Sequence, residues 1–62
     1  MGAKLVKAFG IAKEAGGMQA TMRLAMKSGM SSDKAAAAPD SPENIQKMEA
    51  ALKEVTGKAV KL

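Results

Sequence analysis

The strongest constraint on the fold of this chain is how little bulky apolar material it has for a core. Phe9 is its only aromatic residue, and 13 of its 62 residues are alanine. A chain of this length buries only about 60% of its unfolded surface when it folds. We therefore expect one small domain over residues 1–62, with a thin margin of stability or help from self-association.

Glycines divide the first half of the chain into two expected helices, residues 3–15 and 18–28. The Gly16-Gly17 pair ends the first helix and Gly29 ends the second, because glycine enters a left-handed cap without strain. Gly10 lies inside the first helix and costs it about 1 kcal/mol relative to alanine. At 3.6 residues per turn this helix places four apolar residues on one face: Leu5, Ala8, Phe9 and Ala12.

Serine and proline mark the helices expected in the second half. The Ser31-Ser32-Asp33 run predicts the cap of a short helix near residues 32–37, and Ser41 followed by Pro42 predicts the start of a helix over residues 42–56. An apolar stripe runs along this last helix, formed by Ile45, Met48, Leu52 and Val55.

These elements predict an all-α fold, a small bundle of three main helices over residues 3–15, 18–28 and 42–56 with a short helix near 32–37. Residues 58–62 follow Gly57 as an extended or frayed C-terminal tail. A lone strand of that length would have no partner, so we expect the tail to fold over the core.

The residue types that are absent exclude several classes of function. The chain has no cysteine and no histidine, so it lacks a thiolate nucleophile, a zinc-finger framework and the side chain best suited to proton transfer near neutral pH. Its carboxylates are dispersed and do not form the convergent pair that general acid–base catalysis needs. We expect a non-catalytic protein with no cofactor and no small-molecule substrate.

No stretch of the sequence has the character of a signal peptide or a membrane span. The longest uncharged run, residues 15–22, contains two glycines, a glutamine and a threonine. A secretory signal needs about 7–15 apolar residues after a basic start, and a transmembrane helix needs about 20. Since no cysteine indicates an oxidising compartment, we expect a cytoplasmic protein.

Methionines recur at every fourth residue through the second expected helix and just beyond it. Methionine is flexible and often fills a core, but it also lines adaptable surfaces that dock partner helices. Thioethers at this spacing would also suit Cu(I). The sequence leaves all three interpretations open, with core filling the simplest. If the stripe is exposed, it is the expected partner-binding surface: Met18, Met22, Met26 and Met30.

Positive charge is concentrated in the first half of the chain. Residues 1–30 carry five cationic side chains and one carboxylate, a net charge of +4, whereas residues 31–62 are neutral overall. Such an excess attracts phosphates or anionic lipid, although solubility alone would also account for it. The charged residues of the first half are Lys4, Lys7, Lys13, Arg23 and Lys27, against Glu14.

The junction between the second and third expected helices is similar to the turn of helix-turn-helix proteins. In that family a small residue lies four positions before the turn glycine, and an apolar residue and a capping serine follow it. Ala25, Gly29, Met30 and Ser31 occupy these positions. The resemblance implies nucleic-acid binding, here mainly through phosphate contacts, and the residues placed to make them are Arg23, Lys27, Ser32 and Lys34.

Residues 1–10, MGAKLVKAFG, resemble the opening of leaderless membrane-active bacteriocins. That resemblance implies a basic amphipathic helix lying in the lipid interface. The sequence as a whole favours a small helical protein that acts by binding another macromolecule, either a protein partner or a second copy of itself. Nucleic-acid binding is the first alternative to this hypothesis and membrane activity is the second.

Overall fold

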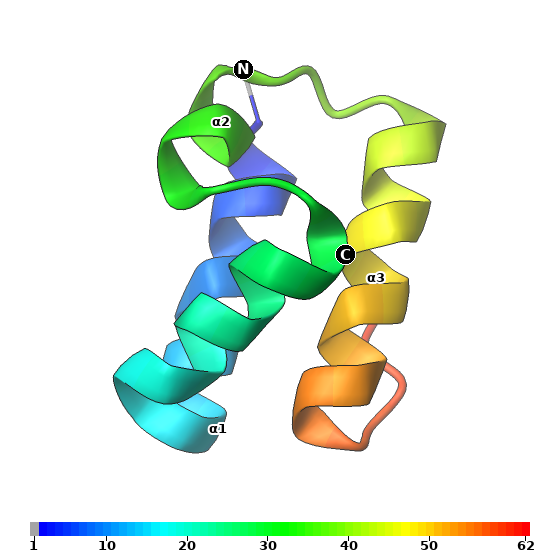
Figure 1. Cartoon of the computed structure of the whole chain (residues 1–62). Coiled ribbons are helices and arrows are strands. Elements are labelled where there is room, and N and C mark those ends of the chain that lie inside the picture. The colour runs from blue at the N-terminus through cyan, green and yellow to red at the C-terminus, as the bar shows by residue number, and fades with distance from the viewer. Residues whose placement is uncertain (1) are drawn as a thin grey trace.

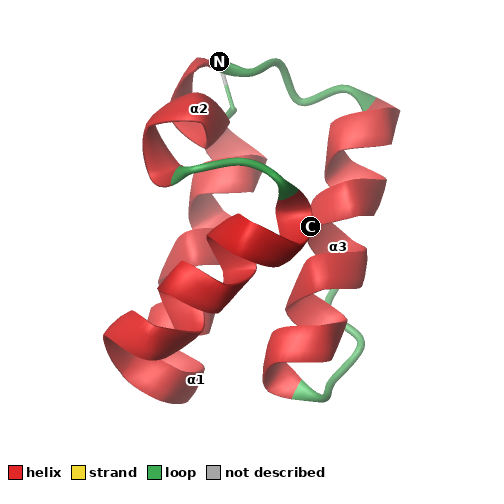
Figure 2. Cartoon of the chain, in the orientation of Figure 1, coloured by secondary structure: helices red, strands yellow, loops and turns green. Residues whose placement is uncertain are grey.

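The computed structural model describes residues 2–62, which form helices and connecting loops only (Figure 2). Helix α1 spans Ala3–Ser28, α2 spans Ser32–Ala37 and α3 spans Pro42–Thr56 (Figure 1). The all-α fold class expected from the sequence is confirmed. Met1, the first residue of the expected domain and of the bacteriocin-like stretch, lies outside the described residues.

Helix α1 bends back on itself at Gly16 and Gly17, so it consists of two helical segments (Figure 1). The φ and ψ angles are −150° and 16° at Gly16 and 70° and −154° at Gly17. The positive φ at Gly17 is one that residues with a Cβ rarely adopt, which explains why glycine occupies the turn. The first segment (residues 3–15) and the second segment (residues 18–28) correspond to the two helices expected there.

Serine hydroxyls begin the two later helices, as the sequence predicts. The Ser31 hydroxyl accepts a hydrogen bond from the backbone N–H of Lys34 at 3.2 Å, and the Ser41 hydroxyl accepts one from Asn44 at the same distance. Each bond satisfies a backbone donor that has no partner within its own helix. The expected helix starts near residues 32 and 42 are therefore confirmed.

The core lies between α3 and both segments of α1. Its largest fully buried side chains are Leu5, Leu24, Met48 and Leu52. Alanines fill the space around them and let the helices approach closely, which compensates for the shortage of bulky residues. These buried alanines are Ala8, Ala12, Ala20, Ala35 and Ala51.

The core-filling interpretation of the methionine stripe is wrong for Met18, Met22 and Met26. Their side chains are 75%, 64% and 81% exposed. The second segment of α1 instead buries Ala20 and Leu24. Two residues along a helix correspond to about 200° of rotation, so the methionine stripe lies on the face opposite the buried one.

Two contacts near the start of the chain hold α2 and the loop after it against α1. The backbone N–H of Gly2 donates a hydrogen bond to the Ala36 carbonyl at 3.3 Å, and a Cβ on Gly2 would collide with the carbonyl of Ala35. The backbone N–H of Lys4 donates to Oδ2 of Asp40 at 3.4 Å. These contacts fix α2 beside the first segment of α1.

The C-terminal tail packs on the core as an irregular segment rather than a strand. Val60 and Leu62 are partly buried against the core, and the backbone N–H of Leu62 donates to Oε2 of Glu49 at 2.8 Å. The expected fold-over of residues 58–62 is therefore confirmed.

Candidate functional site

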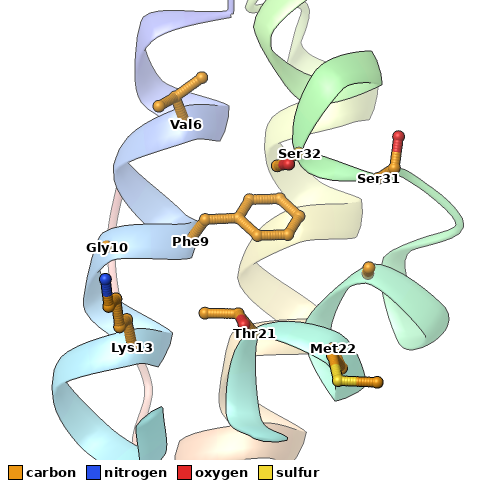
Figure 3. Close-up of a pocket in the computed structure, with 9 residues that line it drawn as sticks. Val6, Phe9, Gly10, Lys13, Thr21, Met22, Ser31 and Ser32 are labelled. Atoms are coloured by element: carbon orange, nitrogen blue, oxygen red, sulfur yellow. The ribbon is translucent and has the colours of Figure 1, made fainter. Parts of the chain in front are cut away.

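An open groove of about 610 Å³ lies between the two segments of α1 and the start of α2. Val6, Phe9, Gly10 and Lys13 form its wall on the first segment. Figure 3 shows the Phe9 ring pointing from this wall toward the second segment. Phe9 also packs partly against the core, so its position is fixed from behind.

The opposite wall combines small, apolar and hydroxyl side chains. Thr21, Met22 and Ala25 contribute from the second segment of α1, and Ser31 and Ser32 close one end at the start of α2 (Figure 3). The Thr21 hydroxyl donates to the carbonyl of Met18 at 2.7 Å and is therefore engaged within its own helix. Met22 supplies the large apolar side chain of this wall.

The groove exists because small residues lie where larger ones would fill it. A Cβ placed on Gly10 would meet no atom within 4 Å, so the space beside this glycine is open. Ala25 on the facing wall is also small. Gly10 therefore lowers the stability of the helix relative to alanine, but it leaves the apolar surface beside it accessible.

Among residues 2–62, Lys13 is the one ionisable residue that lines the groove, so this lining carries positive charge and no carboxylate. The other charged residues of the first half lie outside the lining of the groove: Lys4, Lys7, Arg23, Lys27 and Glu14. Lys27 is in part neutralised, because its Nζ lies 3.5 Å from Oε1 of Glu54 on α3.

The predicted partner-binding methionines do not all line one hollow of the surface, and partner binding through them stays a prediction. Met22 lines the groove, whereas Met26 lines a separate depression of about 390 Å³ between the end of α1 and α3. Met18 is exposed outside both. Met30 is partly buried against the core. Met22 and Met26 line different hollows, and the Cu(I) interpretation stays untested.

The residues predicted for nucleic-acid contact are likewise divided between surfaces. Ser32 lines the groove, while Lys27 lines the depression on the α3 side and pairs with Glu54. Arg23 and Lys34 are exposed. Nucleic-acid contact by these four residues stays a prediction.

Phe9 and Val6 are groove residues that the sequence analysis did not identify. Phe9 was expected on the buried face, but it lies at the edge of that face and is shared between core and groove. Val6 is 45% exposed. The sequence signal that could have indicated the groove is Gly10, because a glycine inside a helix leaves open space on its face.

No known protein family, curated protein or solved structure matches this chain in sequence or structural comparison. Within residues 2–62, no helix combines the length and the apolar character needed to cross a bilayer. Across the same residues, no three acidic side chains gather where they could hold a metal ion.

Proposed function

We propose that this protein is a non-catalytic binding protein whose α1 groove docks an acidic amphipathic helix of a partner protein. The observation that carries the proposal is the composition of the groove. Its walls hold the accessible apolar side chains of Val6, Phe9 and Met22, and its one charged residue is Lys13.

The apolar side chains of the groove give a partner something to bury. Val6 and Met22 are 45% and 64% exposed in the free protein. Removing apolar surface from water contributes roughly 25 cal/mol per Å². The Phe9 ring offers a rigid aromatic surface at the centre, where anchor residues contribute most to binding.

The shape of the groove suits a helix. It runs between two helical segments and is open to solvent, in contrast to the enclosed sites typical of small ligands. Helices dock into such grooves through apolar residues spaced three and four apart. Met22 can adapt to different side chains because its thioether chain is unbranched and flexible.

The charge of the groove determines which kind of partner helix it would attract. The first 30 residues carry a net charge of +4, and no carboxylate lines the groove. Glutamates and aspartates flanking the apolar face of a partner would be attracted to Lys13 and to the net positive charge of this half of the chain, which speeds association and disfavours basic partners. The same charge disfavours pairing of two copies through this surface, because each copy would bring Lys13 and no groove carboxylate to pair with it.

An NMR titration tests the proposal. The ligand is a synthetic helical peptide of about four turns with leucines on one face and glutamates elsewhere, a length at which helices form in complexes. We expect saturable shifts of the amide signals of Val6, Gly10, Thr21 and Ala25. A matched peptide with lysine in place of every glutamate should bind much more weakly. Equal binding of both peptides, or shifts outside the groove, would contradict the proposal.

Anionic vesicles and duplex DNA are the comparison ligands in this titration. Binding to either at moderate salt, without binding of the acidic peptide, would favour the membrane or nucleic-acid alternative instead. Phosphate contacts weaken steeply as salt rises, so each comparison is made at two salt concentrations.

A further inference from the structure

The methionines of this protein differ widely in their access to solvent. Met18, Met22 and Met26 are 75%, 64% and 81% exposed, whereas Met48 is fully buried. Exposed thioethers react with peroxides, and the product, methionine sulfoxide, is polar and is reduced by dedicated reductases. One of the three exposed methionines, Met22, also lines the groove.

We propose that Met22 is a site of reversible oxidation by hydrogen peroxide and that its sulfoxide weakens docking in the groove. In the reaction an S–O bond forms and the O–O bond of the peroxide breaks. The proton of the transferred oxygen passes to the departing hydroxide to give water. Sulfur loses two electrons and the peroxide gains them. This inference rests on the proposed function of the groove.

The position of Met22 explains why its oxidation would matter. It lines the groove together with Phe9 and Val6, and Figure 3 shows its side chain at the rim, directed away from the Phe9 ring, where an incoming helix would cover it. A sulfoxide oxygen buried against apolar side chains loses its hydrogen bonds to water, which opposes binding. The neighbouring Thr21 hydroxyl already donates its hydrogen bond to the Met18 carbonyl, so it does not provide a donor for the sulfoxide oxygen.

Met18 provides the matched control. It lies one turn away on the same face of the same helical segment and is at least as exposed, but it does not line the groove. Its oxidation introduces the same polar group without placing it against the docked helix. The effect on binding should therefore depend on Met22 and be independent of Met18.

The test compares the wild-type protein with Met22→Leu and Met18→Leu after treatment with hydrogen peroxide, using the acidic leucine peptide as ligand. Leucine preserves apolar volume and cannot be oxidised at sulfur. We expect oxidation to weaken peptide binding about tenfold, a shift readily measured by titration, in the wild type and in Met18→Leu. Peroxide treatment should leave the affinity of Met22→Leu at the value measured for the untreated variant, and sulfoxide reductases should restore the wild type.

Peptide mapping by mass spectrometry establishes which methionines were oxidised. Unchanged affinity after full conversion of Met22, or an equal loss in Met22→Leu, would overturn this inference and leave the proposed function standing. If sulfoxide is found at Met48 and the helical circular dichroism signal disappears, the weaker peptide binding is due to unfolding. That result would also overturn this inference. Failure of the untreated protein to bind the peptide would overturn the proposed function and this inference together.

Discussion

The Asp40 carboxylate caps α1 from a distant part of the chain, because its Oδ2 accepts the backbone N–H of Lys4 at 3.4 Å across 36 residues of sequence. α1 has no side-chain cap of its own, since Gly2 occupies the capping position. The carboxylate satisfies a helix donor and lies at the positive end of the helix dipole. This contact helps to fix the segment that carries Val6 and Phe9.

Replacing Asp40 with alanine should lower the free energy of unfolding by about 1 kcal/mol, the usual loss for a helix cap. Urea denaturation followed by circular dichroism measures the change. Asp40→Asn retains an acceptor oxygen but loses the charge, so its loss should be smaller. An Asp40→Ala protein as stable as the wild type would show that the contact contributes nothing.

Gly2→Ala should destabilise the protein by about 1–3 kcal/mol, the range for overpacked sites. The added Cβ would collide with the Ala35 carbonyl and lie 2.7 Å from that of Ala38. The packing of α2 on α1 must then loosen, which thermal unfolding would detect as a lower Tm. An unchanged Tm would mean that the start of the chain adjusts at no cost.

Gly10→Ala should have the opposite effect and stabilise the protein by up to about 1 kcal/mol, because alanine favours the helix and its Cβ meets nothing within 4 Å. The same denaturation measurement applies. Measuring both glycine variants side by side separates the two kinds of site, and a destabilised Gly10→Ala protein would contradict the open space described beside this residue.

The two faces of the second segment should differ sharply in their tolerance to truncation. Leu24→Ala should cost about 2–5 kcal/mol, because Leu24 is fully buried. Met22→Ala and Met26→Ala should each change stability by less than about 0.5 kcal/mol, as exposed substitutions do. If the methionine variants were as destabilised as Leu24→Ala, the methionine face would belong to the core.

The sequence predicted the helices well because their ends are marked locally. Gly17, Ser31 and Ser41 act through backbone conformation or a hydrogen bond a few residues away, and those signals do not depend on the rest of the fold. The face of α3 that carries Met48 and Leu52 was predicted equally well, because only one apolar stripe runs along that helix.

The second segment of α1 was harder to predict because it carries two apolar stripes with the same spacing. Met18, Met22 and Met26 form the more hydrophobic stripe, but Ala20 and Leu24 form the buried one. The small side chain of Ala20 permits close packing in a core that has few large residues. Which stripe is buried depends on how the helices fit together, and the periodicity of the sequence does not report this. The groove could not be predicted for the same reason, because its position depends on which stripe is buried.

The groove variant Gly10→Gln tests the central claim most directly. Glutamine is a good helix former, and its Cβ would meet no atom within 4 Å, so its side chain can extend into the open space beside Gly10. Ala15→Gln is the matched control, because Ala15 is exposed on the same segment and lies outside the groove. We predict that calorimetric titration with the acidic leucine peptide shows binding to the wild type and Ala15→Gln, and a loss of about tenfold or more in Gly10→Gln. Equal affinity of all three proteins would contradict the claim that partners dock in the α1 groove.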